Sequence, residues 1–436
     1  MKKILSVAAA VCMCAALFAN GGAEGGKSAK GAVVPYDPAK KYTVRIGAFG
    51  DLETAYKAVF ATDDFKKKFP NVTIVFQSSD FSGHHNRLTT VLAAGEATND
   101  IESLEIGYVA KFVEGGGLTD LAPAPFNGAA AGKDLVKFAM SNATTKDGKI
   151  VAMPVDIAPA VLFYRKSLAD AAGVNFDNLK NWDEFIAVSK KLVKDRNGDG
   201  KVDQFAIPHA SEVAMMPLNG GKAGWFDASG KPLEPKAKFI EALKLVKDIR
   251  AAGIDGDLGG WSGPWTQSFS DGTVAAIVNG AWWGGSLKTW VAPDLSGDWR
   301  VAYLPGKQWA SQGGTYLAIP EFVSGEQKAV AWEILKYLAT SPVAQLTTFR
   351  TIDAYPALTT VYNDPVMDEP VEYFGGQKVR KIYADVARNI PSAIVTEYDA
   401  TANAIFGNAV TDVLVNGKSP EDAYKGALME ILSLVD

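Results

Sequence analysis

The sequence predicts an α/β protein with two packed domains. Segments with strand character alternate with segments of helical periodicity, which is the order expected when helices are layered on largely parallel sheets. The chain has 436 residues, of which 47% are hydrophobic. A chain of this length and composition can bury two hydrophobic cores.

Strands are predicted where short runs of β-branched and aromatic residues lie between turn residues. They cover 42–48, 72–77, 101–106, 150–153, 160–164, 273–278 and 299–303. Helices are predicted from a period near 3.6 residues and from their start and stop signals. They cover 52–69 before Pro70, 86–94, a segment ending at Gly115, 182–193, 235–252, 326–340 and 420–434. Asn181 and Ser419 are the expected N-caps of two of these helices.

The stretch 147–174 predicts a crossing between two lobes. A turn at Asp147-Gly148-Lys149 leads into the strand 150–153, a proline, and an acidic residue, Asp156, in an apolar setting. A second strand, 160–164, follows directly. We therefore expect the chain to pass from one sheet to another here, with Asp156 at the crossing.

The first residues predict export. Lys2 and Lys3 precede an uncharged segment, 4–18, and small residues that suit cleavage after Ala19 or, alternatively, Ala23. The uncharged segment is too short to span a bilayer as a helix, so we expect a removed signal peptide at 1–19. The Gly-, Ala-, Ser- and Lys-rich segment 20–40 predicts a flexible leader.

The cysteines support the same location. Cys12 and Cys14 are the only two, and both lie in the signal segment, so the mature chain is expected to have no disulfide and no thiolate chemistry. Lipidation of either one is an alternative that would tether the exported protein to a membrane. We expect a periplasmic or extracytoplasmic protein.

Charge excludes some partners. The formal net charge is −5, without long runs of one sign, so nucleic acid and anionic membrane surfaces are not expected partners.

Catalysis also has little support in the sequence. The three histidines are His84, His85 and His209, and the chain has no HExxH, GxSxG, Walker or dinucleotide motif. A pair of carboxylates for glycoside hydrolysis stays open, because their separation is set by the fold.

The segment 195–203 resembles the first part of an EF-hand calcium loop. Oxygen-bearing residues, a sharp-turn glycine at position six and an apolar residue at position eight occur at the spacing that Ca²⁺ needs. The candidate ligands are Asp195, Asn197, Asp199, Lys201 and Asp203. Position twelve is Ala206, where a bidentate glutamate belongs, so a further ligand would have to come from elsewhere. A hydrogen-bonded turn of Asp and Asn residues is the alternative. A structural Ca²⁺ is the one cofactor we expect.

Tryptophans give the best evidence for a ligand site. Four of the ten, Trp261, Trp265, Trp282 and Trp283, fall within 23 positions, next to glycines and turn residues. Rings in such a setting are expected at the ends of strands, where a flat ligand face can stack. Sugars combine apolar C–H faces with hydroxyl groups, and they suit rings beside a few polar side chains.

Several segments together resemble the extracellular solute-binding proteins of ABC importers, the family that includes maltose-binding protein. They include the stretch 147–174, RLTTVLAAGEATNDIESLE followed by FVEGGGLTDL, DGTVAAIVNGAWW, GGTYLAIP and AVAWEILKYLATSPVAQL. Their order and spacing cover nearly the whole mature chain. The resemblance implies the periplasmic-binding-protein-like fold, in which two α/β lobes are joined by three hinge crossovers around a central ligand cleft.

The resemblance also implies lobes and cleft residues. The first lobe would hold 41–155 and 302–351, and the second 156–301 and 352–436. The cleft would be lined by Asp51, Phe81, Ser82, Glu105, Tyr108, Asp156, Trp261, Trp282, Trp283, Gly314, Thr315 and Arg350. Asp156 would accept hydrogen bonds from ligand hydroxyls, the tryptophans would stack, and Arg350 would donate to a ligand oxygen. After Asp156 the chain has Ile157, Ala158 and Pro159, which offer few polar contacts.

The implied function is binding without turnover. A carbohydrate, expected to be a neutral or weakly anionic oligosaccharide, would close the two lobes, and the closed monomer would deliver it to a membrane permease. Two other hypotheses stay open: an exported carbohydrate-active enzyme, and a binding protein for a non-sugar solute such as a peptide or a polyamine. The sequence does not identify the sugar, its linkage or the permease.

Overall fold

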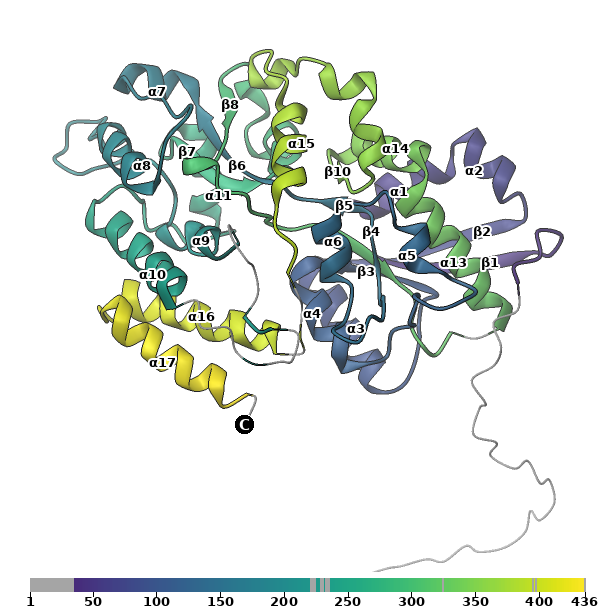
Figure 1. Ribbon diagram of the computed structural model, residues 1–436. Coiled ribbons are helices and arrows are strands. Elements are labelled where there is room, and N and C mark those ends of the chain that lie inside the picture. Colours follow the sequence, from purple (N-terminus) through teal and green to yellow (C-terminus); the bar gives the residue numbers. More distant parts are fainter. Residues whose placement is uncertain are drawn as a thin grey trace, which may run out of the picture. The chain divides into compact units, whose positions relative to one another are not determined.

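The computed structural model describes residues 35–219, 225–227, 231, 236–323, 325–393, 396 and 398–434. The predicted signal peptide, its cleavage sites and the two cysteines lie outside these residues. Within them, Figure 1 shows sheets flanked by helices, and the α/β fold class is confirmed. In the described part, no helix is both long enough and apolar enough to cross a membrane.

One sheet has five strands. Their order is β2 (Val72–Ser79), β1 (Tyr42–Phe49), β3 (Ile101–Glu105), β9 (Thr315–Ala318) and β4 (Met153–Pro154). β1 runs parallel to β2 and β3, whereas β9 runs antiparallel to β3 and β4. Largely parallel sheets were predicted, and this is wrong outside the β1 pairs. β9 enters the sheet after a return crossing from the other sheet, so its direction is not set by a β-helix-β unit.

The helices packed around this sheet are α1 (Leu52–Phe60), α2 (Asp63–Lys68), α3 (Phe81–Ala93), α4 (Ile106–Gly115), α5 (Gly128–Ala131), α6 (Lys137–Asn142), α13 (Gly325–Thr340) and α14 (Pro342–Ile352). Two helix predictions need correction. The helix expected over 52–69 is broken, because the Thr62 hydroxyl accepts a hydrogen bond from Phe65 N and starts a new helix. The helix expected at 86 begins at Phe81, because the Asp80 carboxylate caps Gly83 N at 2.9 Å.

The second sheet is antiparallel throughout, with β6 (Ala160–Arg165) between β7 (Ala276–Gly280) and β8 (Trp299–Ala302). β6 is buried on both faces, and its side chains alternate between two hydrophobic clusters. Val161 and Phe163 join the cluster that also holds the core of the five-stranded sheet. Ala160, Leu162 and Tyr164 join the other cluster. The two-residue period of a strand therefore links two cores.

The other helices are α7 (Lys166–Ala172), α8 (Trp182–Ser189), α9 (Met216–Asn219), α10 (Lys236–Ala251), α11 (Gly263–Asp271), α12 (Trp283–Ser286), α15 (Val379–Asn389), α16 (Asp399–Leu414) and α17 (Pro420–Leu432). α10, α16 and α17 pack on one another. Both predicted N-caps are confirmed. Asn181 accepts a hydrogen bond from Glu184 N at 2.8 Å, and Ser419 accepts one from Asp422 N at 3.0 Å.

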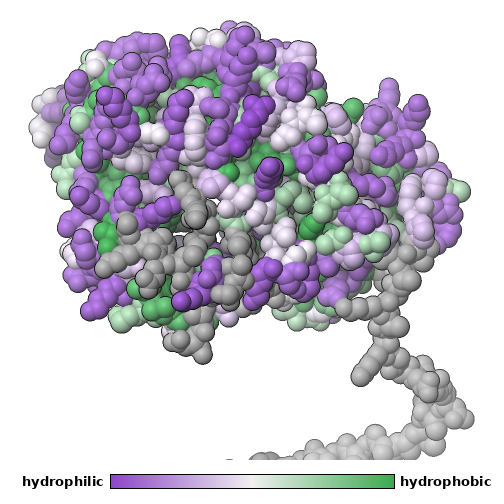
Figure 2. Space-filling view, in the orientation of Figure 1, coloured by the Kyte–Doolittle hydropathy of each residue, from purple (hydrophilic) through white to green (hydrophobic). Residues whose placement is uncertain are grey.

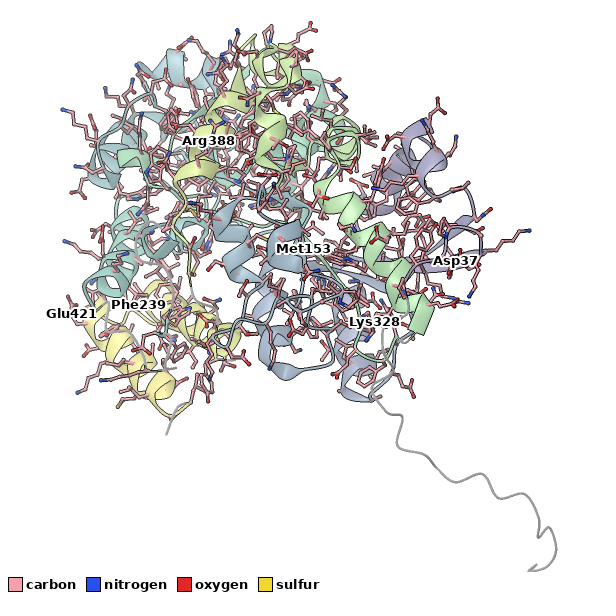
Figure 3. All side chains as sticks on the ribbon, turned by 45° about the vertical axis from the view of Figure 1, so that its right-hand side comes forward. Asp37, Met153, Phe239, Lys328, Arg388 and Glu421 are labelled. Atoms are coloured by element: carbon pink, nitrogen blue, oxygen red, sulfur yellow. The ribbon has the colours of Figure 1, made fainter. Side chains whose placement is uncertain are left out.

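The chain passes between the sheets through three crossovers. The first runs from β4 through β5 (Asp156–Ile157) to β6, the second from β8 to β9, and the third from α14 through β10 (Tyr355–Pro356) to α15. β5 and β10 pair antiparallel with each other, so two crossovers lie side by side. Figure 3 shows Met153, which starts the first crossover, between Phe239 of α10 and Asp37. The lobe boundaries at 155, 302 and 351 stay a prediction.

The packed part of the chain begins before residue 41. Tyr36 packs on Tyr42 and Phe69, with ring centroids 5.5 and 6.1 Å apart. The leader was predicted to be flexible up to residue 40, and this is wrong for its last residues because an aromatic side chain ties them to the body. Hydrophilic residues cover most of the face shown in Figure 2, with apolar residues scattered among them.

Candidate functional site

A pocket of about 1550 Å³ opens where the two sheets meet the crossovers. Its wall comes from the loop after β1, the start of α3, the end of β3, the crossovers, the loop before α11, the segment after β7 and the end of α14. The parallel strands β1, β2 and β3 all point their carboxyl ends at this region. In open α/β sheets this is the edge where ligands bind.

The structure brings most of the predicted site residues together on this wall. Those that line the pocket are Asp51, Phe81, Ser82, Glu105, Asp156, Trp261, Trp282, Gly314, Thr315 and Arg350. Their contact with a ligand stays a prediction.

Tyr108 and Trp283 are not among the residues that line the pocket. Trp283 is completely buried against Trp265 and Phe269, with centroids 5.2 and 5.1 Å away, so its predicted place on the cleft surface is corrected. It supports the neighbouring rings from behind. Tyr108 is instead stacked on His85, with centroids 4.0 Å apart.

Three tryptophans form a row on the wall, which we name the tryptophan row: Trp265, Trp261 and Trp282. The centroids of Trp265 and Trp261 are 5.2 Å apart, and those of Trp261 and Trp282 are 6.0 Å apart with planes only 12° from parallel. Trp261 is 65% exposed, and its φ of 63° is rare for a residue with a side chain. Such strain at an exposed ring in a pocket is typical of a functional site.

The indole N–H groups at both ends of the row already donate hydrogen bonds within the protein. Trp265 Nε1 donates to Glu212 Oε1 at 2.6 Å, and Trp282 Nε1 donates to the main-chain oxygen of Gln312 at 2.9 Å. The row therefore offers ring faces to a ligand, and polar recognition has to come from other groups.

Three carboxyl groups of the wall have a raised pKa. Burial raises the pKa of Asp156 to about 6, that of Glu105 to about 7 and that of Glu212 to about 8. Asp156 Oδ1 accepts a hydrogen bond from Thr315 N at 3.0 Å, and Glu105 Oε2 accepts one from Gly107 N at 2.7 Å. Glu212 Oε2 is shielded from solvent and has no hydrogen-bond partner among the described residues.

The basic groups of the wall are each next to a carboxylate. Lys288 pairs with Asp353, Arg380 contacts Glu369 at 3.2 Å, and Arg350 lies 3.7 Å from Asp364. By contrast, the ion pairs found in the described part include none for Asp156, Glu105 or Glu212. The uncompensated groups of the pocket are therefore acidic.

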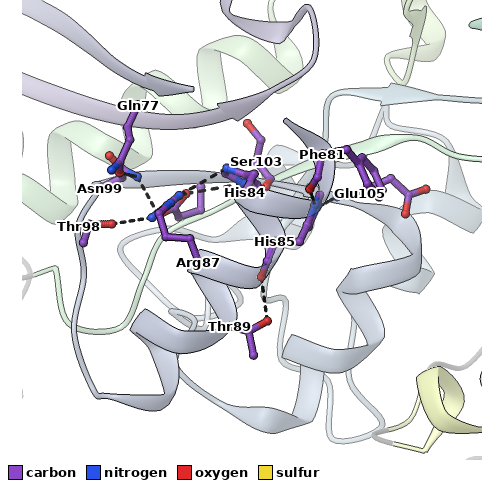
Figure 4. A network of polar contacts seen from close by, with 11 residues as sticks. Gln77, Phe81, His84, His85, Arg87, Thr89, Thr98, Asn99, Ser103 and Glu105 are labelled. Atoms are coloured by element: carbon purple, nitrogen blue, oxygen red, sulfur yellow. Dashed lines mark hydrogen bonds and ion pairs between the residues drawn. The ribbon is translucent and has the colours of Figure 1, made fainter. Parts of the chain in front are cut away.

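Behind the first part of α3, polar side chains fix the helix to β3. His84 Nε2 lies 2.7 Å from Ser103 O, and Glu105 N donates to His85 Nε2 at 3.1 Å (Figure 4). Arg87 Nη2 donates to the buried Glu102 Oε2 at 3.0 Å. Burial lowers the pKa of both histidines, that of His85 to about 4. The histidine pair thus holds the pocket-lining start of α3 in place.

Sequence reasoning missed several wall residues, including Glu212, Gln312 and Trp290. Trp290 is 51% exposed, and its ring centroid lies 6.5 Å from that of the buried Trp283. Its position seven residues after Trp283 is a signal that the sequence did carry. Glu212 and Gln312 lie in segments without a motif, so no local signal marks them.

The pKa of Glu212 predicts a dependence of stability on pH. Between the ordinary glutamate value near 4.5 and about 8, the folded protein keeps a proton that the unfolded chain has lost, so the free energy of unfolding falls as pH rises. Glu212→Gln removes this titration and can keep the oxygen that accepts from Trp265. We expect the variant to gain at least about 1 kcal/mol over the wild type between pH 5 and pH 8. Urea unfolding at both pH values measures the difference.

The control for this experiment is Glu421→Gln, an exposed position of α17 at the left edge of Figure 3. Because Glu421 lies in the first turn of α17, its charge stabilises the helix at both pH values, so the difference in stability between Glu421→Gln and the wild type should be the same at pH 5 and pH 8. An equal gap between Glu212→Gln and the wild type at pH 5 and pH 8 would contradict the assignment of the raised pKa to Glu212.

The candidate calcium ligands lie on an exposed loop, where they bond to the loop itself. Asp195 accepts hydrogen bonds from Gly198 N and Gly200 N at 2.6 and 2.8 Å, and Asp203 holds the main-chain N–H of Arg196 at 2.8 Å. Asn197 and Asp199 each accept a hydrogen bond from the amide two residues on. Among the described residues, no group of three His, Cys, Asp or Glu side chains is placed to hold a metal ion. This arrangement is that of the hydrogen-bonded turn named above as the alternative.

The profile of a family described as bacterial extracellular solute-binding protein matches residues 61–375. An arabinooligosaccharide-binding protein from Halalkalibacterium halodurans is 24% identical over 383 residues, which cover 84% of each chain.

Solved structures are similar in fold. A crystal structure described as extracellular solute-binding protein family 1 matches with a TM-score of 0.76 and 23% identity, over 91% of this chain and 100% of that chain. The ABC transporter associated binding protein from B. animalis subsp. lactis, in complex with β-1,6-galactobiose, matches with a TM-score of 0.72 and 22% identity, over 90% of this chain and 97% of that one. These likenesses confirm the two-lobed binding-protein fold.

Proposed function

The chain belongs to the bacterial extracellular solute-binding protein family, and we propose that it binds a neutral oligosaccharide in the pocket described above. The observation that carries this proposal is the pair of near-parallel rings of Trp261 and Trp282 on the pocket wall. Such rings bury the C–H face of a sugar, and nearby carboxyl groups bond its hydroxyls. The names of the arabinooligosaccharide-binding relative and of the galactobiose complex support a carbohydrate.

The charges of the wall favour a neutral sugar. A uronic acid would meet the carboxylate of Asp156, whose pKa of about 6 leaves it mostly ionised at neutral pH. Glu105 and Glu212, with pKa values of about 7 and 8, carry less charge there, and the nearby basic groups are already next to carboxylates. A hydroxyl group both donates and accepts hydrogen bonds, so it suits a carboxyl group in either protonation state. We therefore narrow the expected ligand from neutral or weakly anionic to neutral.

The volume of the pocket favours more than one sugar ring. Pockets for small molecules usually measure about 300–1,000 Å³, whereas this one measures about 1550 Å³. An oligosaccharide fills such a space better than a monosaccharide.

The mechanism we propose is capture by closure. Wall residues come from elements on both sides of the crossovers, so a ligand that contacts both sides stabilises the closed arrangement. The loaded protein, an exported monomer that binds without turnover or nucleic acid, would then dock on the membrane permease of an ABC importer.

A cationic solute such as a polyamine is the second candidate. The carboxylate of Asp156 and the exposed Trp261 ring, both on the pocket wall, are the observation that favours it, because cations bind both carboxylates and aromatic faces.

A thermal-shift screen tests the function. Mature protein is unfolded and refolded to remove carried-over solute, then heated with arabinotriose, maltotriose, β-1,6-galactobiose, galacturonic acid oligomers, spermidine and a tripeptide. A ligand that binds only the folded state raises the melting temperature by mass action. We expect a rise with a neutral oligosaccharide and none with the uronic acid oligomers. A rise with spermidine alone would show that the ligand is a cationic solute and not a sugar. Chromatography of the sugar after incubation with the protein tests for hydrolysis, which an enzyme would cause.

We also propose that Ca²⁺ stabilises the loop 195–203, on the support of its ligand spacing. Asp203 would have to release Arg196 to reach the ion. We expect 1 mM CaCl₂, roughly the concentration range of weak extracellular calcium modules, to raise the melting temperature relative to EGTA. The rise should be lost in Asp195→Ala. No rise in the wild type would leave the loop as a hydrogen-bonded turn.

A further inference from the structure

The second crossover carries a polar residue, Gln312, on the pocket wall. Gln312 precedes β9, and its main chain is fixed at both ends of the residue. Gln312 N donates to Ala158 O on the first crossover at 2.9 Å, and Gln312 O accepts from Trp282 Nε1 at 2.9 Å. Gln312 therefore lies between the first crossover and the tryptophan row, on the pocket wall.

The side-chain oxygen of Gln312, Oε1, has no hydrogen-bond partner among the residues that the structure describes. This atom is also shielded from solvent. A buried acceptor without a donor costs free energy, and it is uncommon in folded proteins. The unmet hydrogen bond on a pocket wall points to a donor supplied from outside the protein.

The neighbouring groups cannot supply this donor or replace the side chain. Trp282 Nε1 already donates to the main-chain oxygen of Gln312, and Thr315 N already donates to Asp156 Oδ1. Gly313 and Gly314 have φ of 107° and 130°. A Cβ on Gly313 would lie 3.1 Å from Trp282 Nε1, and one on Gly314 would lie 3.1 Å from Asp156 O. The stretch 312–314 thus offers the pocket one functional side chain.

We propose that Gln312 is a ligand-binding residue on the crossover itself, and that its Oε1 accepts a hydrogen bond from a hydroxyl of a saccharide stacked on Trp282. This inference rests on the proposed function. Because Oε1 is shielded from solvent in the free protein, the side chain has to turn toward the ligand to meet the hydroxyl, and this turn breaks no existing hydrogen bond of Oε1. The crossover would then select sugars by one hydroxyl, because a site built for a hydrogen bond rejects analogues that lack it.

The test combines a protein variant with a changed ligand. Gln312→Met keeps the length of the side chain and removes the amide. Gln267→Met, at an exposed position of α11 outside the pocket wall, is the matched control. Calorimetry measures affinity for the one probe among arabinotriose, maltotriose and β-1,6-galactobiose that gives the largest thermal shift, and for its monodeoxy derivatives.

The expected result has three parts. Gln312→Met binds the probe about 10- to 100-fold more weakly than the wild type, which is the effect of one lost hydrogen bond in a dry site. One monodeoxy derivative binds the wild type more weakly by a similar factor, yet binds Gln312→Met as well as the full probe does. The melting temperature without ligand stays the same or rises, because the variant loses an unpaired polar atom.

Two results overturn the inference while leaving the function intact. The first is that Gln312→Met binds the probe as tightly as the control Gln267→Met does. The second is that every monodeoxy derivative that binds the wild type more weakly than the full probe also binds Gln312→Met more weakly, by the same factor. A lower melting temperature with the second result would make Gln312 a structural residue. If none of the three probes binds the wild type, the proposed function fails and this inference fails with it.

Discussion

Replacing Trp261 by alanine is expected to weaken oligosaccharide binding by about 30-fold or more while leaving the fold stable. Truncation of a central tryptophan in a binding site typically costs about 2 kcal/mol or more. The ring is 65% exposed without ligand, so its loss removes little packing from the free protein. Calorimetry with the best neutral probe measures the affinity, and urea unfolding should change by less than about 0.5 kcal/mol.

The matched control is Phe322→Ala, an exposed aromatic residue outside the pocket wall. Its affinity should equal that of the wild type. Trp282→Ala is a poorer test, because this change also frees Gln312 O on the second crossover. Full affinity in Trp261→Ala would remove the tryptophan row from the binding site.

Replacing Gly280 by alanine is expected to destabilise the protein by about 1–3 kcal/mol, the usual cost of forcing atoms into a packed interior. An added Cβ would lie 2.4 Å from Gln312 O and 2.8 Å from Ala158 Cβ. Both neighbours belong to crossovers that are hydrogen-bonded to each other, so neither can move alone. Urea unfolding measures the loss, and we expect weaker oligosaccharide binding as well because Trp282 must shift.

Gly407→Ala is the control, and this change is expected to stabilise the protein. Gly407 lies within α16, and a Cβ there would meet nothing within 4 Å. Alanine in a helix interior stabilises by about 0.5–1 kcal/mol relative to glycine. If Gly280→Ala and Gly407→Ala changed the free energy of unfolding by the same amount, the close contacts of a Cβ at position 280 would not be destabilising, and this prediction would be wrong.

The sequence predicted the fold class, the order of most elements and ten of the pocket-lining residues. It did so where local patterns decide the structure: caps such as Asn181, strand periodicity, and tryptophans beside glycines. It failed where contacts distant in sequence decide. The direction of β9 depends on a crossing, and the burial of Trp283 depends on Trp265 and Phe269 packing against it.

The same limit explains the missed polar residues. Glu212 has a raised pKa because of its surroundings, and Gln312 is notable because its main chain is held by Ala158 and Trp282. Neither property is visible in the residues on either side. A sequence can place such groups in a lobe, but their chemistry depends on tertiary contacts.

β6 lies in both hydrophobic clusters, with its alternate side chains on opposite faces. Most surface strands can accept substitutions on their solvent side without penalty. This strand has no such side, so any polar or larger residue at 160–164 disturbs one core or the other. Random mutagenesis of the protein should therefore leave this strand almost unchanged among functional variants, and it is the wrong place to introduce a label or a new loop.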